Sequence, residues 1–509
     1  MKKLGVEKPT SFFLKARHLD IQTGHSWIVV LHEDNAREYG VRAGDEVTLR
    51  WRHKETEVKV DLTKNLVKRG EIGLFQDIIK KYQITEGESL EISLAPPPSS
   101  LEAIKKKLLG EQLTSEEYHS IIADIVHYRL DDVQIAYFLA SAFSKKGFSK
   151  EEIYYLTKAM AETGEMLEWS PNEIIADKHS IGGVPGNRTT PIVVSIIASL
   201  GIKIPKTSSR AVTSEAGTAD VLEVLTPVEF SLEEIRQIVE KTNGCMVWGG
   251  ALKLAPADDR ILRVSYELGI EPYSKMIVSI MAKKIAIGAN RLVIDMPIGE
   301  GTKVQSIAEA RKIRDIFLYL SRKFKIKTKV LIEQVGGPIG RGIGPILEIR
   351  DVLRVLQQKD NRPIDLERRA VKLAGILLEL TGKARFVSGE RLAKKQLVSG
   401  AAEKKFREII TTQGGKVPSD SEQLTLGAVK HDLVSPYSGR VKRINSGELI
   451  RVARLLGSPY TKEAGIYLHK KRGERVEKGE IIATLYTNSQ QRLGLAVDEL
   501  KGKDLFYIK

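Results

Sequence analysis

The first ninety residues alternate between apolar and polar side chains with the two-residue period typical of β-strands. Residues 46–51 (EVTLRW) and 57–62 (EVKVDL) follow this pattern. The region also contains a repeat, because residues 34–49 align without a gap on residues 77–92. Each copy predicts a short helix, a glycine turn and a strand. Two such copies predict a small pseudo-symmetric β-barrel, which we expect to serve docking or assembly.

The hydrophobic period changes after residues 95–100 (APPPSS), a stiff proline-rich linker. Apolar residues then recur at helical spacing. Thr114 with Glu117, and Ser149 with Glu152, have the spacing of capping boxes, in which two side chains satisfy the free N–H groups at a helix start. These features predict a helical domain.

From about residue 171 the pattern becomes strand, glycine-rich turn and helix, repeated. Residues 174–177, 291–296 and 329–332 are the clearest predicted strands. This order predicts an α/β domain with a mainly parallel sheet, whose ligands bind beyond the carboxyl ends of the strands. Near the end of the chain, residues 435–441 and 473–480 resemble hairpins of biotinyl/lipoyl-like domains. No lysine in a biotin-type motif stands at the turn, so we interpret them as structural.

Composition narrows the classes of function. The 509 residues include 80 Lys and Arg against 65 Asp and Glu, a net charge of +15, which favours an anionic partner. The single cysteine, Cys245, excludes an intrachain disulfide and a cysteine-based zinc cluster, and suits the reducing cytoplasm. The N-terminus lacks the apolar run of a signal peptide, and the most apolar stretch, residues 191–205, is too short to span a membrane.

The first segment with candidate chemistry is residues 177–190 (DKHSIGGVPGNRTT). It follows a predicted strand and precedes a helix that begins near Thr190. Its glycines allow backbone N–H groups to approach an anion, Lys178 supplies charge, and Ser180 and Thr190 supply hydroxyl donors. The segment has neither the sequence of a P-loop nor that of a Rossmann fingerprint. We therefore expect an oxyanion site of another kind.

The second such segment is residues 206–220 (KTSSRAVTSEAGTAD), which also follows a short apolar stretch. Six hydroxyl groups, a lysine and an arginine within fifteen residues would suit a solvated loop or a second phosphate-binding wall. Its place between a predicted strand and a helix favours the second interpretation.

Together these motifs resemble the thymidine/pyrimidine nucleoside phosphorylase family. The resemblance rests on K-H-S-x-G-G at 178–183, S-x-R at 208–210 and A-G-T-x-D-x-x-E at 216–223, with support from S-I-M-A-K-K at 279–284. It runs from about Leu101 to the C-terminal hairpins. The N-terminal β-module and the variant V-P-G-N-R at 184–188 are similar to the archaeal-type AMP phosphorylase branch in particular.

The resemblance implies a pentosyltransferase that converts AMP and phosphate to adenine and ribose 1,5-bisphosphate, with CMP and UMP as further candidate substrates. The implied inorganic-phosphate site is Lys178, Ser180, Thr190, Ser208 and Thr218. The implied nucleotide-binding positions are Gly183, Ser209, Arg210, Ala211, Val212, Thr213, Ser214, Thr218, Ser279 and Lys303. The implied contacts to the base are Arg263, Ser279 and Lys283. The proton-donor position falls on Glu271, where the branch has Asp.

Other functions fit the sequence less well. The first alternative is the same reaction on nucleosides, that of a thymidine (pyrimidine nucleoside) phosphorylase. A nucleic-acid-binding protein would need a basic stripe with interleaved aromatic residues, yet aromatic residues are only 6% of the chain. A phosphoribosyltransferase would need metal-held pyrophosphate. The adjacent Asp258 and Asp259 precede a predicted helix and are interpreted as caps, so we expect neither a metal nor a cofactor.

We therefore predict a multidomain α/β protein with no nucleic-acid or membrane partner. It begins with a double-psi-like β-barrel and ends in a biotinyl/lipoyl-like α/β hairpin domain. The expected domains are 1–95 (barrel), 101–168 with part of 253–286 (helical), 171–420 (α/β) and 425–509 (C-terminal). The family resemblance implies a homodimer or a larger homo-oligomer.

Overall fold

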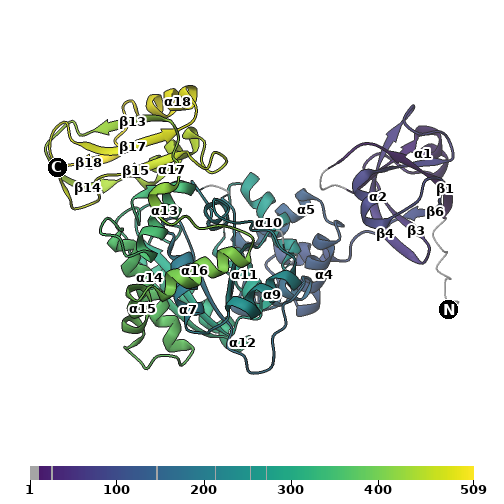
Figure 1. Cartoon of the computed structure of the whole chain (residues 1–509). Coiled ribbons are helices and arrows are strands. Elements are labelled where there is room, and N and C mark those ends of the chain that lie inside the picture. Colours follow the sequence, from purple (N-terminus) through teal and green to yellow (C-terminus); the bar gives the residue numbers. More distant parts are fainter. Residues whose placement is uncertain are drawn as a thin grey trace. The chain divides into compact units, whose positions relative to one another are not determined.

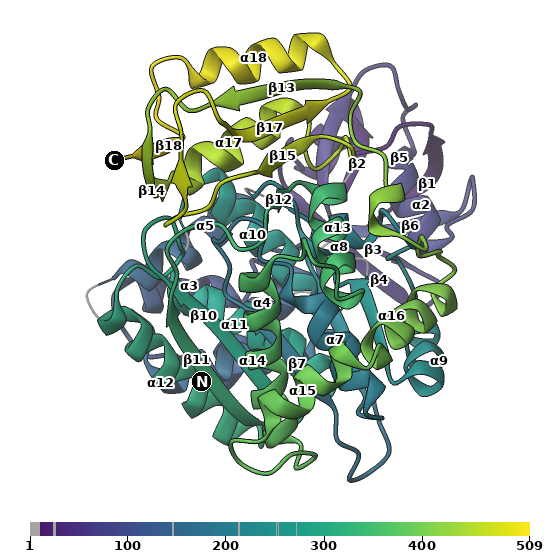
Figure 2. The same ribbon diagram turned by 60° about the vertical axis from the view of Figure 1, so that its left-hand side comes forward.

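A computed structural model describes residues 11–23, 27–144, 147–211, 214–250, 252, 254–270 and 272–509. The chain falls into two compact units. The first consists of Met1–Ala159 and Ala257–Pro272, and the second of Met160–Pro256 and Tyr273–Lys509. Figures 1 and 2 label their helices and strands.

The first unit begins with a closed six-stranded barrel, in the strand order β1-β5-β2-β4-β3-β6 (Figure 1). Its elements are β1 (Phe12–Leu19), β2 (Ile28–His32), α1 (Glu33–Tyr39), β3 (Glu46–Trp51), β4 (Lys54–Thr63), β5 (Glu71–Phe75), α2 (Gln76–Tyr82) and β6 (Ser89–Leu94). The predicted barrel is thus confirmed.

The predicted repeat is also confirmed, and it extends further than the sequence indicated. The pairs α1 and α2, β3 and β6, and also β2 and β5, begin 43 residues apart (33 and 76, 46 and 89, 28 and 71). Val47 and Leu49 of β3 are fully buried, as are their counterparts Leu90 and Ile92 of β6. The two copies therefore contribute equivalent side chains to one core.

The rest of the first unit is helical. It contains α3 (Ser100–Leu108), α4 (Ser115–Val126), α5 (Asp132–Ala140), the 3-10 turn η1 (Ser141–Phe143), most of α6 (Lys150–Glu162) and most of α10 (Pro256–Glu267). Both predicted capping boxes form, at Thr114 with Glu117 and at Ser149 with Glu152. Arg260 of α10 donates hydrogen bonds to the carbonyl oxygens of Ile125 and Leu130, 2.8 Å each.

The second unit is built on a parallel three-stranded sheet in the order β11-β10-β7 (Figure 2). These strands are β7 (Ala176–Ser180), β10 (Arg291–Ile298) and β11 (Lys327–Gln334). A parallel pair, β8 (Ile204–Ser208) and β9 (Gly244–Trp248), is joined to the sheet by a bridge between Ile175 and Lys203. The helices of this part are α7 (Thr189–Ser199), α8 (Thr218–Leu222), α9 (Leu232–Thr242), α11 (Tyr273–Ala286), α12 (Ile307–Lys323), α13 (Pro345–Leu356), α14 (Ile364–Leu380), α15 (Gly389–Val398) and α16 (Ala401–Thr412).

One predicted strand differs in its bounds. The sequence pattern placed a strand at 174–177, whereas β7 runs from Ala176 to Ser180. The strand continues because Lys178 and Ser180 are paired with Val293 and Asp295 of β10. The first candidate segment therefore begins within a strand, and its side chains are held by the sheet rather than by a turn.

The C-terminal part of the second unit carries smaller antiparallel sheets. Its elements are β12 (Gly342–Ile343), the 3-10 turn η2 (Ser421–Gln423), β13 (Val429–Val434), β14 (Gly439–Ile444), α17 (Ser446–Leu456), β15 (Gly465–Leu468), β16 (Arg475–Val476), β17 (Ile481–Thr487), α18 (Gln490–Leu500) and β18 (Phe506–Ile508). The two predicted hairpin segments meet where Gly439 pairs with Val476. In the described part of the chain, no helix is both long and apolar enough to cross a membrane.

Candidate functional site

Lys178 is the middle residue of β7 and is 1% exposed. Its Nζ donates hydrogen bonds to the hydroxyl oxygens of Thr189, at 2.9 Å, and Thr190, at 3.3 Å. Both threonines form the first turn of α7, a helix whose other side chains are almost all in the core. Among the described residues, no carboxylate lies within ion-pair distance of Lys178. The structure therefore places a buried cation beside neutral partners only, and it brings Lys178 and Thr190 together.

Burial lowers the pKa of Lys178 to about 8, because desolvation disfavours the charged form more than the nearby Asp295 carboxylate favours it. The ammonium group is thus cationic below pH 8 and loses its proton above it. We expect affinity for sulfate, whose charge is constant in this range, to fall roughly tenfold between pH 7 and pH 9. Calorimetric titration at both values would measure this, and equal affinities would contradict it.

Ser180, the second predicted phosphate contact, is held by a buried ion pair. Its hydroxyl donates to Asp295 Oδ2 at 3.0 Å. Asp295 Oδ1 in turn accepts a hydrogen bond from Arg369 Nη2 of α14 at 2.5 Å. Asp295 and Arg369 are 0% and 6% exposed. Sequence reasoning named neither residue, although both fix the position of Ser180.

A second buried charge cluster is centred on Asp177, the residue of β7 that precedes Lys178. The Asp177 carboxylate pairs with Lys284 Nζ of α11 at 2.5 Å and with Lys206 Nζ of β8 at 3.5 Å. Burial lowers the pKa of Lys284 to about 8. The pKa of His179 lies well below its usual value because of burial and the surrounding lysines, so its ring is neutral.

The two clusters together leave an excess of positive charge at this end of the sheet. Four buried cations share two buried carboxylates, with Glu333 as a partly exposed third acid bonded to Arg369. The cations are Lys178, Lys206, Lys284 and Arg369, and the carboxylates are Asp177 and Asp295. Buried positive charge without a matching anion is unfavourable, so this arrangement suits a ligand that carries negative charge.

A carboxylate within the second candidate segment, that of Asp220, holds the backbone of this segment. Asp220 Oδ2 accepts the backbone N–H groups of Ala211, at 2.7 Å, and Gly217, at 2.8 Å. Ser208 and Ser214 donate to the backbone carbonyl oxygens of Val247 and Ala216. The predicted positions Val212 and Thr213 lie outside the described residues.

Arg210 is engaged within the same loop. Its guanidinium binds the Glu223 carboxylate through two hydrogen bonds of 2.8 and 2.7 Å and lies over the Trp248 ring, 4.7 Å from its centroid. The two bonds, with weaker contacts to Asp220 and Glu229, neutralise the charge that the sequence suggested for a ligand. The Arg210 side chain is consequently held by acids of its own loop and its neighbours.

Contacts between the two candidate segments hold them side by side. Arg188, which precedes α7, donates to the carbonyl oxygen of Ala216 and forms an ion pair with Glu348 of α13. The backbone N–H of Gly186 donates to Glu215 Oε1 at 3.1 Å. The two segments that carry the residues predicted to hold phosphate are therefore fixed to each other.

Gly183 and Lys303, two predicted nucleotide contacts, also meet. Gly183 has a φ of +85°, and a Cβ placed on it would lie 2.7 Å from the backbone N of Lys303. Ser279 and Lys283 are four residues apart on α11, so they share one face of that helix, and both are partly exposed. The side chains of Ser279, Lys283 and Lys303 belong to the same unit as Lys178.

Two predicted residues are not placed with this group. Arg263 lies on α10 in the first unit, where it forms hydrogen bonds of 3.0 and 3.1 Å with the Asp132 carboxylate. Glu271, the predicted proton donor, lies outside the described residues.

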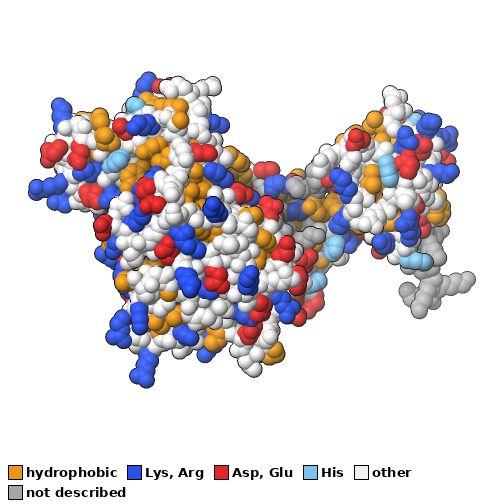
Figure 3. Space-filling model, viewed as in Figure 1, with side chains coloured by type: hydrophobic (Ala, Val, Ile, Leu, Met, Phe, Trp, Pro, Cys, Tyr) orange, Lys and Arg blue, Asp and Glu red, His pale blue; other side chains and the backbone are white. Residues whose placement is uncertain are grey.

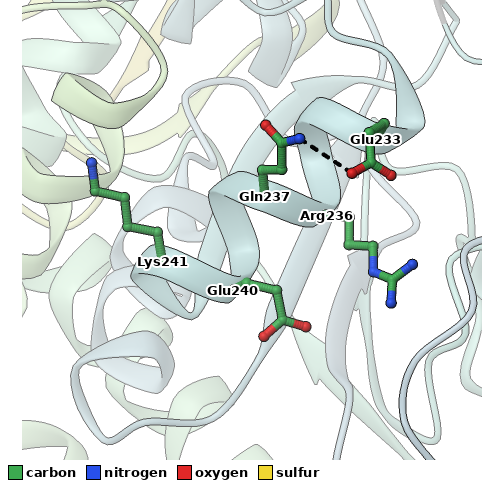
Figure 4. Close-up of a pocket in the computed structure, with 5 residues that line it drawn as sticks. All are labelled: Glu233, Arg236, Gln237, Glu240 and Lys241. Atoms are coloured by element: carbon green, nitrogen blue, oxygen red, sulfur yellow. Dashed lines mark hydrogen bonds between the residues drawn. The ribbon is translucent and has the colours of Figure 1, made fainter.

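The exposed face of α9 carries a shallow hollow of different character (Figure 4). Its lining side chains all come from this helix: Glu233, Arg236, Gln237, Glu240 and Lys241. Gln237 donates to Glu233, and acids and bases alternate, so the hollow favours no charge. On the face shown in Figure 3, basic and acidic side chains are likewise intermixed, without a continuous basic stripe on that face. Neither this hollow nor the face in Figure 3 therefore carries an excess of positive charge like that of the buried cations at β7.

Comparison with known sequence families matches three parts of the chain. Residues 101–164 match the helical bundle domain of the glycosyl transferase family, and residues 172–403 match its a/b domain. Residues 440–503 match the pyrimidine nucleoside phosphorylase C-terminal domain.

Curated relatives align over nearly the full chain. The AMP phosphorylase of Methanocaldococcus jannaschii is 44% identical over 95% of both chains. That of Thermofilum pendens is 43% identical over 94% of this chain and 92% of its own. AMP phosphorylase 1 of Archaeoglobus fulgidus is 38% identical over 95% of both.

One solved structure shares the fold at low identity. Anthranilate phosphoribosyltransferase from Thermus thermophilus superimposes with a TM-score of 0.51 and 20% identity, over 61% of this chain and 99% of its own. At that identity the likeness concerns the fold alone.

Proposed function

Since the chain belongs to the AMP phosphorylase family, we propose that it catalyses the phosphorolysis of nucleoside 5′-monophosphates. AMP and phosphate would give adenine and ribose 1,5-bisphosphate, with CMP and UMP as further substrates. The observation that carries the proposal is Lys178, a fully buried cation on the parallel strand β7 whose hydrogen-bond partners are neutral hydroxyl groups in the first turn of α7. The curated relatives named above, which align over 92–95% of both chains, are AMP phosphorylases, so the thymidine alternative is not favoured.

The reaction forms a bond between a phosphate oxygen and C1′ of the ribose while the bond from C1′ to the base breaks. The base leaves with the bonding electron pair and takes up a proton. We assign the inorganic phosphate to Lys178, Ser180, Thr190, Ser208 and Thr218, where buried positive charge would offset the dianion. Cations fixed in a site of low dielectric constant stabilise negative charge without rearranging during the reaction.

The remaining roles follow the family resemblance. We assign the nucleotide to Gly183, the loop of residues 209–214, Thr218, Ser279 and Lys303. Arg263, Ser279 and Lys283 would contact the base, and Glu271 would supply its proton. Because Arg210 is bonded to Glu223 and the Ala211 N–H to Asp220, we assign this loop's contact to its remaining backbone N–H groups.

The proposal is tested by incubating the purified chain with phosphate and, separately, with AMP, CMP, UMP or thymidine. Free base is measured by chromatography and ribose 1,5-bisphosphate by ³¹P NMR. We expect phosphate-dependent release of adenine from AMP. Turnover of thymidine alone would overturn the choice of a nucleotide substrate, and no turnover of any would overturn the enzymatic assignment.

Gly183→Ala should weaken nucleotide binding more than phosphate binding. The added methyl group would lie 2.7 Å from the Lys303 backbone N, and the φ of +85° is strained for alanine. Displacement of Lys303 should therefore raise the KM for AMP at least about fivefold, given the ~1–3 kcal/mol that such strain costs. Gly182→Ala is a matched control, because Gly182 has a similar φ of +94° but nothing within 4 Å of its Cβ position. Equal KM values for the two variants would contradict the assignment.

We further propose that the enzyme acts in the cytoplasm as a homodimer or larger homo-oligomer. We also propose the domain bounds that the sequence predicts. The barrel would be double-psi-like, and the C-terminal part biotinyl/lipoyl-like. The single thiol, Cys245, supports the location, because it is buried at β9 and forms no disulfide.

A further inference from the structure

A cationic hollow lies beyond the carboxyl ends of β10 and β11, on a different side of the loop that carries Lys303. Its walls come from four segments of the second unit (elements labelled in Figure 2). These are the loop 299–301, residues 334–337 from the end of β11 onward, residues 442–447 from the end of β14 to the start of α17, and Arg472. Nothing in the proposed reaction uses this hollow.

The charged lining of this hollow is mostly basic. Lys442, Arg443 and Arg472 face one acid, Glu300, which is bonded to Arg443 at 2.7 Å. Within the described residues, no carboxylate lies within ion-pair distance of Lys442 or Arg472. Two positive charges are therefore available to a ligand, and both come from the C-terminal part.

The remaining wall consists mainly of backbone. Four glycines at 299, 301, 336 and 337 line it, so main-chain groups are accessible where side chains would otherwise cover them. The Arg472 guanidinium lies so close to Gly336 that a Cβ on this residue would overlap Nη1. The absence of a side chain at position 336 thus allows Arg472 to lie against the end of β11.

From these features we infer a second anion site, which takes a small phosphate-bearing molecule between the ends of β10 and β11 and the C-terminal part. Guanidinium and ammonium groups above a glycine-rich backbone are the donors that phosphate oxygens prefer. Inorganic phosphate and a nucleoside monophosphate share this chemistry.

The position of the site couples it to the proposed nucleotide contacts. In the loop between Gly299 and Lys303, Gly301 lies near Ser446 of α17, whereas Thr302 and Lys303 contact Gly183. A ligand bound on the Gly301 side would restrict the same loop that presents Lys303. This consequence rests on the proposed function, but the anion site itself does not.

The test is equilibrium dialysis with radiolabelled phosphate and, separately, with AMP, in a Lys178→Met background that weakens the proposed catalytic phosphate site. For phosphate we expect one remaining site per chain, and for AMP one site in addition to the proposed nucleotide site. The affinity of this additional site should fall at least tenfold when Lys442→Ser and Arg472→Ser are added. Lys430→Ser with Lys478→Ser is the matched control, because these exposed lysines on the same part remove the same charge elsewhere.

Each outcome decides the inference. Loss of phosphate binding in the Lys442/Arg472 variant, but not in the control, would support a free-phosphate site. Loss of AMP binding alone would support a nucleotide site. Equal binding by the two double variants, or no binding in the Lys178→Met background, would overturn it. The measurement is of binding, so failure of the proposed catalysis would leave this result interpretable.

Discussion

Replacing Lys178 with methionine is expected to lower kcat/KM for phosphorolysis at least about a thousandfold while leaving the fold as stable as before or more stable. The loss follows because a buried, positioned cation stabilises the charge of the attacking phosphate, an effect of about 10²–10³ for a single donor and larger for a full charge. The gain in stability follows because methionine fills a similar volume without burying a charge that only hydroxyl groups contact.

Activity assays and thermal unfolding would be measured on the same preparation. Lys430→Met serves as the control, since Lys430 is exposed on β13 and should tolerate the change in both measurements. If Lys178→Met unfolded at a much lower temperature, Lys178 would be a structural residue. If it retained a tenth of the activity or more, the phosphate site would lie elsewhere.

The sequence predicted the barrel and the two candidate segments because both depend on local patterns. The two-residue period and the internal repeat identify the barrel, and glycine-rich segments after strands mark the carboxyl edge of a parallel sheet. Lys178 and Thr190 meet as expected because the end of β7 and the start of α7 are only a few residues apart.

What the sequence could not predict is which distant charges are paired. Asp295 and Arg369 are 74 residues apart, and Lys284 follows Asp177 by 107, so no spacing rule relates them. Arg210 is the opposite case, a charge that the sequence left unpaired and that the fold pairs. Residue type alone made it a ligand for phosphate, whereas the fold brings Glu223 to its guanidinium and uses the charge within the loop.

Arg369→Met is the second change with a large expected effect, and here the effect is on stability. It leaves the Asp295 carboxylate, which is fully buried, without its cation, and breaking such a pair from one side typically costs about 3–5 kcal/mol. Chemical denaturation should show this decrease in the free energy of unfolding. Lys372→Met is the control. Lys372 and Arg369 both pair with Glu333, but the pair that Lys372 forms is partly exposed.

Combining Arg369→Met with Asp295→Leu separates the structural role of the pair from its role in the site. The double variant replaces both charges by apolar side chains, so most of the lost stability should return. Phosphate affinity should not return, because the Ser180 hydroxyl no longer has the acceptor that orients it, 3.0 Å away in the native protein. We expect the double variant to recover stability while its KM for phosphate stays at least about tenfold above that of the native protein. A tenfold change corresponds to ~1.4 kcal/mol of binding free energy lost from the site alone. Recovery of both would mean that the pair only holds the fold together.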